Sequence, residues 1–465
     1  MPKPLDSIYI TYWSLLDPLC QSQTLPYLRS LSRRGYRIGL MTFEQPRWAM
    51  TNAQRRSKQK ELASEGIHWH PLRYHKWPPV LSTLYDIGVG SFVATTMARR
   101  CGASLVHGRS SVSCAMAAFA AKLAGVCLFV DADGPLSQEY VDAGAWKRGS
   151  IPHRLTEWGE RKALQLADVA AVLTTHRKEQ VAPWLSDSTP VYVLPCAVDL
   201  NRFRPIEEGR EELRQALGLR GTVFVYAGKP GGWYDTEAMV AFLSAAKEVF
   251  HPMALLVLTQ DGVDEFAALC EEAGVPMASR SVPPQEMPHY LSCADVGLCF
   301  LKPFPSKLAC SPIKLGEYLG CGLPVVSTSG CGDYDELIEA ESIGVVVANA
   351  DRAAYPRAAR ELAQLLKDPG IRVRCRDAVQ KRVGLDEVVA PRYAEIYAHL
   401  LGSAGSDTLR YPGIALAITL KSASAHDTSR HGKLRPSGGR GIRRTEAPGR
   451  HSRYGKPLDC GMRSL

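Results

Sequence analysis

The sequence predicts an α/β protein built from two successive parallel-sheet domains. Short apolar runs alternate with amphipathic helical segments from residue 7 to residue 175, and a second series of the same kind begins at residue 221. This alternation is typical of strand–helix–strand units whose helices cover both faces of a parallel sheet. A proline-bounded irregular stretch, Pro190–Pro205, separates the two series. Ligands of such sheets bind beyond the carboxyl ends of the strands, so two domains face to face predict a cleft between them.

The individual elements follow from the pattern of apolar residues. In the first series we predict strands at 7–13, 36–43, 104–109, 126–134 and 169–175, and helices at 22–35, 113–125 and 154–167. In the second series the strand-bearing segments are 221–235, 253–260, 288–300 and 323–330. We therefore divide the chain into an N-terminal domain at 1–190, a C-terminal domain at 191–385, a closing helix at 386–401 and a tail at 402–465.

Charge is concentrated in the tail. The chain carries a net charge of +9, and residues 402–465 hold twelve Lys/Arg and four Asp/Glu, which is a net +8. This Gly-, Ser- and Arg-rich segment has too little apolar surface to fold alone and is predicted to be a disordered basic tail. The folded body is nearly neutral, which argues against nucleic-acid binding. Thirteen cysteines without a C-x-x-C pair indicate reduced thiols and a cytoplasmic protein. No stretch approaches the roughly 20 apolar residues of a membrane span.

One segment, Ser311–Ser327, combines charged and apolar residues in an unusual way. Lys314 and Glu317 are three residues apart and share a helix face. If the helix begins near Ser311, that serine caps it, and the helix start with Lys314 suits a phosphate, while Glu317 suits sugar hydroxyls. The alternative is an ordinary surface ion pair, and the spacing alone favours that alternative.

The same segment resembles the donor-binding motif of the retaining GT-B glycosyltransferases of family four, also called group 1. Glu317 and the YLGCGLPVV run after it match the second glutamate of that motif and its continuation, whereas Ala309 stands where the first glutamate would be. Four further segments resemble family motifs in the same order, and the likeness covers most of residues 7–401. These are the acceptor-side loop and helix at 17–35, the interdomain motif at 193–205, the first turn of the donor domain at 225–234, and the loop that meets the base at 282–300.

The resemblance implies particular site residues on each side of the cleft. On the donor side they are Glu317, Lys314, Ser311, Lys229, Gly228 and Val282, with Tyr234 at the place of a second basic residue. On the acceptor side the loop residues are Asp17, Gln21 and Ser22. The catalytic candidates His107, Arg109 and Asp133 lie at the carboxyl ends of two predicted strand segments that would end at the cleft.

Two of these assignments have competing interpretations. Asp131 and Asp133 form a D-x-D pair, which in another glycosyltransferase fold binds a divalent metal, but here the pair precedes the donor motif by about 180 residues. We favour a cleft-lining role for Asp133, with turn formation as the second interpretation. His107 is either a cleft residue or a satisfied core histidine, so Arg109 is the better candidate to meet an anionic group.

The resemblance implies a GT-B fold of two Rossmann-like domains and transfer of a sugar from a nucleotide diphosphate sugar to a hydroxyl acceptor, with retention. It implies no cofactor, no essential metal, and an acceptor that is a glycan, a glycolipid or a small molecule, as in polysaccharide biosynthesis. Because many relatives use lipid-linked acceptors, the basic run at 55–60 is either a solvated helix face or a contact with the cytoplasmic face of the inner membrane. The alternative function is a nucleotide-sugar-binding protein with impaired or no transfer, given Ala309. An oxidoreductase is disfavoured because no G-x-G-x-x-G follows a strand, and a glycosidase because no carboxylate pair flanks one site.

Overall fold

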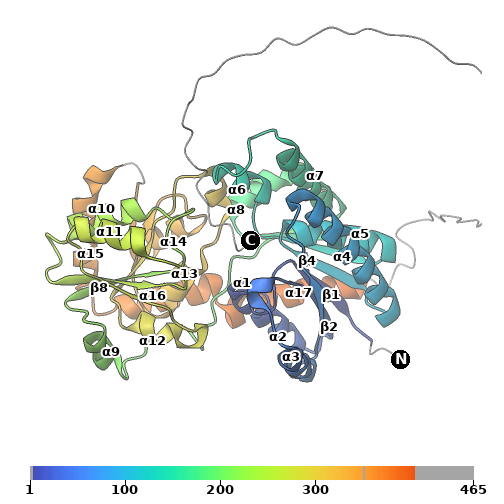
Figure 1. The fold of residues 1–465 in the computed structure, drawn as a ribbon, viewed down its shortest axis with the longest axis horizontal. Helices are drawn as coiled ribbons and strands as arrows, with labels where there is room; N and C mark the ends of the chain where they lie inside the picture. Colours follow the sequence, from blue (N-terminus) through green and yellow to red (C-terminus); the bar gives the residue numbers. More distant parts are fainter. Residues whose placement is uncertain (1–3, 349–350, 404–465) are drawn as a thin grey trace, which may run out of the picture.

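The computed structural model describes residues 4–348 and 351–403, so the tail predicted at 402–465 lies almost entirely outside the described residues. The described chain forms two domains, each built around one parallel sheet, as predicted (Figure 1). Every pairing between neighbouring strands of these sheets is parallel.

The N-terminal sheet has seven strands in the order β3-β2-β1-β4-β5-β6-β7. The strands are β1 Ser7–Thr11, β2 Ile38–Glu44, β3 Ile67–Arg73, β4 Leu105–Arg109, β5 Cys127–Ala132, β6 Val169–Val172 and β7 Val191–Val193. Strand β3 is absent from the elements that the sequence pattern predicts. The predicted domain boundary at 190 is wrong, because residues 191–193 pair with β6 and complete this sheet.

Two layers of helices cover this sheet. One face packs against α4 Pro79–Cys101, α5 Ser111–Ala124 and α7 Ile151–Leu166, through small side chains such as Ala94 and Ala117. The other face packs against α2 Leu25–Arg33 and α17 Ala390–Ser403. The remaining helices are α1 Pro18–Gln23, α3 Asn52–Ser64, α6 Leu136–Asp142 and α8 Thr175–Val181, with 3₁₀ turns η1 Pro46–Trp48 and η2 Ala182–Trp184. The helix predicted at 22–35 is therefore two helices that meet at Thr24.

The C-terminal sheet has six strands in the order β10-β9-β8-β11-β12-β13. They are β8 Thr222–Ala227, β9 Met253–Leu258, β10 Met277–Arg280, β11 Val296–Cys299, β12 Val325–Thr328 and β13 Gly344–Val347. The helices are α9 Arg210–Ala216, α10 Thr236–Ala246, α11 Asp264–Glu272, α12 Met287–Ser292, α13 Ile313–Gly320, α14 Tyr334–Ala340, α15 Tyr355–Leu365 and α16 Ile371–Val383. Short turns complete it: η3 Pro284–Glu286, η4 Pro305–Ala309 and η5 Arg352–Ala354.

The chain passes between the domains twice, and the two passages lie side by side. Val198, in the first passage, pairs with Gly384 in the second. The Val198 amide donates to the Val383 carbonyl at 2.9 Å, and the Leu385 amide donates to the Val198 carbonyl at 2.9 Å. After this point the chain forms the π-helical turn η6 Leu385–Val389 and α17, which returns to the N-terminal domain and packs in its core. Figure 1 shows α17 in orange beside the blue strands β1 and β2.

A buried ionic cluster fixes α17 against the N-terminal sheet. Arg109, at the end of β4, binds Asp131 on β5 with 2.5 Å between Nη1 and Oδ2. The same Nη1 donates to the hydroxyl of Tyr393 on α17 at 2.8 Å, and that hydroxyl donates in turn to Asp131. Burial alone would raise the pKa of Asp131, but the charge of Arg109, with the neighbouring His107 and the hydrogen bond of Tyr393, outweighs it and lowers the pKa. The pair is therefore ionised.

We predict that Asp131→Asn strongly destabilises the fold. The change leaves the Arg109 guanidinium buried without a counter-charge, which costs about 3–5 kcal/mol in comparable buried pairs. Urea unfolding measures the loss. The matched control is Glu157→Gln, which removes a carboxylate from a partly exposed pair with Arg161 and should change stability by no more than about 0.5 kcal/mol. Equal effects of the two substitutions would contradict the role given to the cluster.

Candidate active site

The side chain of Lys314 is the central feature of the donor side. It lies near the start of α13 with only 7% of its surface exposed. Its Nζ stands 3.5 Å from the ring centre of Tyr234 and 4.1 Å from that of Tyr226. Within residues 4–348 and 351–403, this nitrogen has no hydrogen-bond partner. Burial lowers the pKa of Lys314 to about 8, although Glu317 and nearby cysteines oppose the shift. An ammonium held only by aromatic faces has unused hydrogen-bonding capacity, which an anionic ligand could satisfy once the nitrogen is uncovered.

The turn after β8 leaves room for this lysine. Gly228 adopts φ +129°, and a Cβ at this position would come within 2.9 Å of Lys314 Nζ. Any side chain here would therefore meet both backbone strain and the ammonium. Gly231 and Gly232 also have positive φ, so the whole turn depends on glycine. Lys229 lies between Gly228 and Gly231 and is exposed. The predicted grouping of Gly228, Lys229 and Lys314 is thus found at the carboxyl end of one strand.

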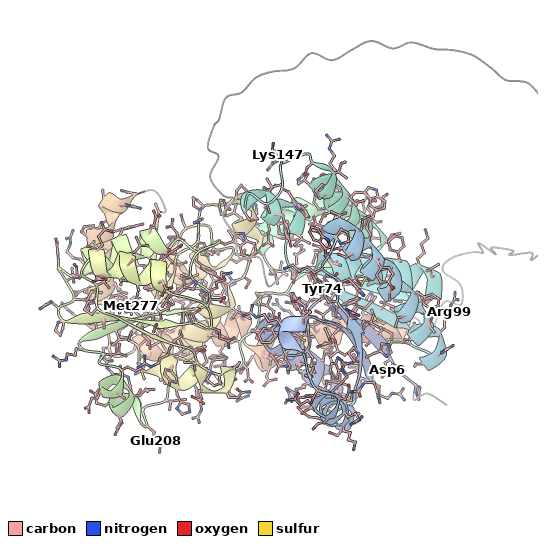
Figure 2. The ribbon with its side chains drawn as sticks, in the orientation of Figure 1. Asp6, Tyr74, Arg99, Lys147, Glu208 and Met277 are labelled. Carbon is pink, nitrogen blue, oxygen red and sulfur yellow. The ribbon has the colours of Figure 1, made fainter. Side chains whose placement is uncertain are left out.

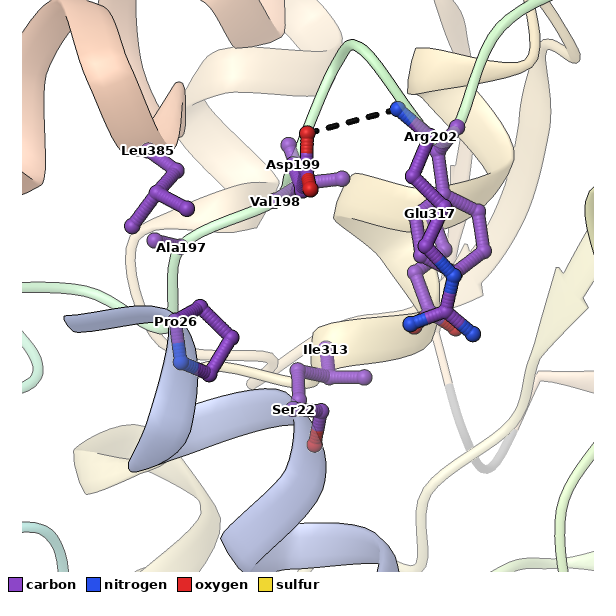
Figure 3. A pocket seen from close by; sticks show the side chains of 10 residues that line it. Ser22, Pro26, Ala197, Val198, Asp199, Arg202, Ile313, Glu317 and Leu385 are labelled. Carbon is purple, nitrogen blue, oxygen red and sulfur yellow. Dashed lines mark hydrogen bonds between the residues drawn. The ribbon is translucent and has the colours of Figure 1, made fainter. Parts of the chain in front are cut away.

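Glu317 faces a different space from Lys314. It lines a narrow pocket between the domains, together with Arg202 and Ile313 from the C-terminal domain and Ser22 and Pro26 from α1 and α2 (Figure 3). Burial raises the pKa of Glu317 to about 7, and the charges of Arg202 and Lys314 oppose that shift. The surface ion pair considered for Lys314 and Glu317 is wrong, because Lys314 Nζ makes no hydrogen bond to Glu317 and is covered by Tyr226 and Tyr234.

Two donor-side predictions are corrected by the structure. Ser311 does not cap α13, which begins at Ile313 with Pro312 at its N-cap. Instead the Ser311 hydroxyl accepts a hydrogen bond from the Cys196 amide at 3.1 Å and so ties α13 to the first interdomain passage. The side chain of Val282 packs in the core of the C-terminal domain and is not exposed to a ligand in this conformation. The capping role of Ser311 is wrong, whereas its place beside the donor remains a prediction.

Most polar side chains of the acceptor-side loop form hydrogen bonds within the loop. Asp17 is buried, and its carboxylate caps α1 by accepting from the Leu19 amide at 2.9 Å. Gln21 donates to the Leu15 carbonyl at 2.7 Å, and Ser22 donates to the Pro18 carbonyl at 2.7 Å. Of the three, only Ser22 lines the interdomain pocket. Asp17 therefore positions α1. In this conformation its buried side chain is not exposed to an acceptor, contrary to the prediction.

The prediction that His107 and Arg109 face the cleft is also wrong. Both are buried under α17, and His107 Nδ1 lies 3.0 Å from the Tyr397 hydroxyl. Burial lowers the pKa of His107, so its ring is neutral. Asp131 forms a buried ion pair with Arg109. The sequence could not reveal this, because the residues that enclose the pair come from α17, about 260 positions later in the chain.

Asp133 remains a candidate. It follows β5 and is half-buried. Burial raises the pKa of Asp133 to about 7, and the repulsion of Asp131 and Glu139 adds to the effect against the attraction of Arg109. A carboxyl group with this pKa is partly protonated near pH 7, which suits a group that acts as an acid or a base in catalysis. In its neighbour Asp131, Oδ2 is engaged by Arg109 and Tyr393. Among the described residues, no three His, Cys, Asp or Glu side chains are grouped as metal ligands.

The turn η4 makes a direct contact between the domains that the sequence did not indicate. Lys307 forms an ion pair with Glu139 of α6, at 3.1 Å, and its Nζ also lies 4.0 Å from the ring centre of Trp233. The Ser306 amide donates to Asp142 of α6 at 3.0 Å, and the Thr174 hydroxyl donates to the Leu308 carbonyl at 3.0 Å. Ala309, at the place of the family's first glutamate, ends this turn and is buried. We call these contacts of residues 306–308 the η4 contact.

Family models match both halves of the chain. The model described as Glycosyl transferase 4-like domain matches residues 20–197, and the model described as Glycosyl transferases group 1 matches residues 221–368. Together they cover more than half of the chain. Two facing Rossmann-like domains with a helix that returns to the first define the GT-B class of glycosyltransferases. The chain belongs to the group 1 glycosyltransferases of this class, the family that the motifs resembled, and it is a glycosyltransferase enzyme.

Solved structures confirm the fold. Sucrose-phosphate synthase from Thermosynechococcus elongatus superposes with a TM-score of 0.63 at 16% identity, over 86% of this chain and 100% of that one. HepE of Anabaena, solved in complex with UDP, gives 0.59 at 14% identity, over 85% and 100%. WaaG, a glycosyltransferase involved in lipopolysaccharide biosynthesis, gives 0.57 at 16% identity, over 84% and 99%. A comparison with curated proteins finds no match.

We predict that Glu139→Gln loosens the two domains. The change leaves the largely buried Lys307 ammonium without its carboxylate, at a cost of about 1–3 kcal/mol. Small-angle X-ray scattering should give a larger radius of gyration than for the parent protein. Glu179→Gln, on the exposed side of α8, is the control and should scatter like the parent. An unchanged radius for Glu139→Gln would show that the η4 contact does not hold the domains together.

Proposed function

We propose that this glycosyltransferase takes its sugar from a nucleotide diphosphate sugar and passes it to a hydroxyl acceptor. The observation that carries the proposal is the buried ammonium of Lys314, which has no hydrogen-bond partner in the described part of the chain and lies beside the glycine turn at the end of β8. Carboxyl ends of parallel strands are where such sheets bind nucleotides. The shared fold adds support, since HepE has been solved with UDP and with UDP-glucose.

In this proposal the chemistry is the stabilisation of a leaving diphosphate. Negative charge on the diphosphate grows as the bond to the sugar breaks, and an ammonium already in place stabilises that state most. The ribose is assigned to Glu317, one helical turn further along α13. Lys314 Nζ is covered in this conformation, so either the lysine leaves the tyrosine rings or the turn Gly228–Gly232 moves. Moving the Lys314 ammonium away from the two tyrosine rings costs on the order of 2 kcal/mol. Charge-assisted hydrogen bonds to a diphosphate stabilise the complex by more than this cost.

On the acceptor side we assign Asp133 and Ser22 as the groups nearest to the reacting hydroxyl. Retention of configuration, the absence of an essential metal, a glycan or lipid-linked acceptor in polysaccharide biosynthesis and a cytoplasmic location are part of the same proposal. The second candidate is a nucleotide-sugar-binding protein with impaired transfer. The observation in its favour is Ala309, which gives the family's sugar-contact position only a buried methyl group.

A substitution series with and without chelator tests the proposal. Lys314→Ala should lower donor turnover by about 10²–10³-fold, as expected for the loss of one preorganised charge in the transition state. Donor hydrolysis with UDP-, GDP-, ADP- and dTDP-sugars is the assay, and EDTA should leave the parent enzyme active. Lys367→Ala, which removes an exposed lysine of the same domain, is the control. An enzyme abolished by EDTA, rescued by manganese and damaged more by Asp133→Asn than by Lys314→Ala would overturn the mechanism.

We also predict that nucleoside diphosphate affinity falls as the pH rises through about 8. Burial sets the pKa of Lys314 at about 8, so the ammonium is present below this pH and is lost above it. Glu317 and Asp133 have pKa values raised to about 7, and the tyrosines around Lys314 have raised pKa values and stay neutral. Between about pH 8 and 9.5 the dissociation constant should rise up to tenfold per unit. Calorimetric titration measures it. Lys314→Gln should bind weakly at every pH in this range, and the same slope in that variant would exclude Lys314 as the titrating group.

A further inference from the structure

The outer surface of the N-terminal domain carries a concentration of exposed apolar side chains. Nine large apolar side chains in the described part of the chain are at least half exposed, and eight of them lie on α4, α5, α7 or just before α4; the ninth is Val373. The most prominent are Trp77, Leu81, Phe92, Phe119, Ile151 and Trp158, which we call the apolar face. Trp77 and Ile151 are more than 80% exposed. A concentration of exposed apolar side chains on neighbouring helices is the kind of surface that contacts a partner or a membrane.

The three helices form one continuous layer. α5 packs between α4 and α7, and all three turn their small residues toward the same face of the sheet. Figure 1 shows them side by side on the N-terminal domain. On α4, Leu81 and Phe92 are separated by eleven residues, three helical turns, and so lie on one side of the helix. The apolar face is therefore a surface of the layer and not a set of unrelated side chains.

The exposed charges on this layer are mostly positive. Exposed cations on the three helices are Arg99, Arg100, Lys122, Arg154, Arg161 and Lys162. The acidic residues are few: Asp86 and Glu160 are buried, and Glu157 is engaged with Arg161. In Figure 2, Arg99 of α4 projects at the right-hand edge of the N-terminal domain. Apolar and aromatic side chains among cations match the surface of an anionic bilayer, where headgroups attract the cations and the acyl boundary accepts the apolar groups.

We propose that the apolar face of α4, α5 and α7 docks the protein on an anionic phospholipid bilayer. A second copy fits less well, because a symmetric contact would bring the same cationic surface against itself. The helix α4 is long and apolar enough to cross a membrane by length and composition, which corrects the expectation that no stretch approaches such a length. Here, however, Ala94 and Ala98 of α4 are buried against the sheet, so the helix lies on the bilayer and does not span it.

The position of the face relates it to the cleft. In a parallel sheet the helix that follows a strand begins at the carboxyl edge, and α4 begins six residues after β3 ends. Trp77 and Leu81 therefore lie near the edge of the sheet that faces the C-terminal domain. A docked protein would hold its cleft close to the lipid surface, where a lipid-linked acceptor is presented. The docking itself does not depend on the proposed sugar transfer.

Vesicle binding tests the proposal with the full chain. The parent protein should sediment with phosphatidylcholine vesicles that contain phosphatidylglycerol, and much less with phosphatidylcholine alone. The triple variant Leu81→Ser, Phe92→Ser, Trp158→Ser should bind anionic vesicles at least about tenfold more weakly, while donor hydrolysis in solution stays at the parent level. Because these side chains are exposed, the variant should keep the parent melting temperature. Val373→Ser, on the exposed surface of α16, is the matched control and should bind like the parent.

Further outcomes distinguish the apolar face from three other possible contacts: the basic tail, the basic run on α3 and a second copy of the chain. All variants carry the same basic tail, so the loss in the triple variant cannot come from it. A double variant Arg56→Glu, Lys60→Glu tests the basic run on α3. Loss of binding in that variant, with the triple variant unaffected, would overturn the proposal and assign the contact to α3. Binding of the triple variant equal to that of the parent would overturn it as well. Self-association of the parent that the triple variant lacks, without vesicle binding, would show a contact between copies instead.

Discussion

The buried pair of Arg109 and Asp131 is the interaction on which the arrangement of the two domains depends. Tyr393 joins the pair from α17, so the end of the described chain is fixed to the first domain although the preceding helices belong to the second. The chain must therefore pass between the domains twice, and the two passages pair at Val198 and Gly384. Ser311 connects one passage to α13. The position of Glu317 across the interdomain pocket from Ser22 of α1 is consistent with these links.

Charge is used differently on the two sides of the cleft. On the N-terminal side the guanidinium of Arg109 is engaged by Asp131 and Tyr393, which makes the cluster structural. On the C-terminal side the Lys314 ammonium lies against tyrosine faces without a hydrogen-bond partner among the described residues, and burial lowers its pKa to about 8. The second arrangement costs stability, because a buried charge without a partner is unfavourable. A loss of stability of this kind is typical of a binding site in which a ligand supplies the missing partner.

The alternation of strands and helices predicted the fold class, because it is a local pattern. The grouping of Lys314 with Gly228 came from the resemblance of two segments to family motifs. The sequence did not predict the fate of His107, Arg109 and Asp131, because their partners on α17 are distant in sequence and no local signal pairs them. The predicted cap at Ser311 is wrong, since the N-cap is Pro312 and the helix begins at Ile313. The η4 contact was missed because Lys307 and Glu139 lie in separate domains, and ion pairs between domains leave no periodic pattern.

The most direct test of the proposed nucleotide site is a crystal structure of the protein with a bound nucleoside diphosphate. We expect the phosphates within hydrogen-bond distance of Lys314 Nζ, at the turn after β8, and the ribose hydroxyls on Glu317. We also expect Arg109 and Asp131 to remain paired under α17. A nucleotide bound at the end of β5 beside Asp133, with Lys314 still enclosed by Tyr226 and Tyr234, would contradict the proposed site.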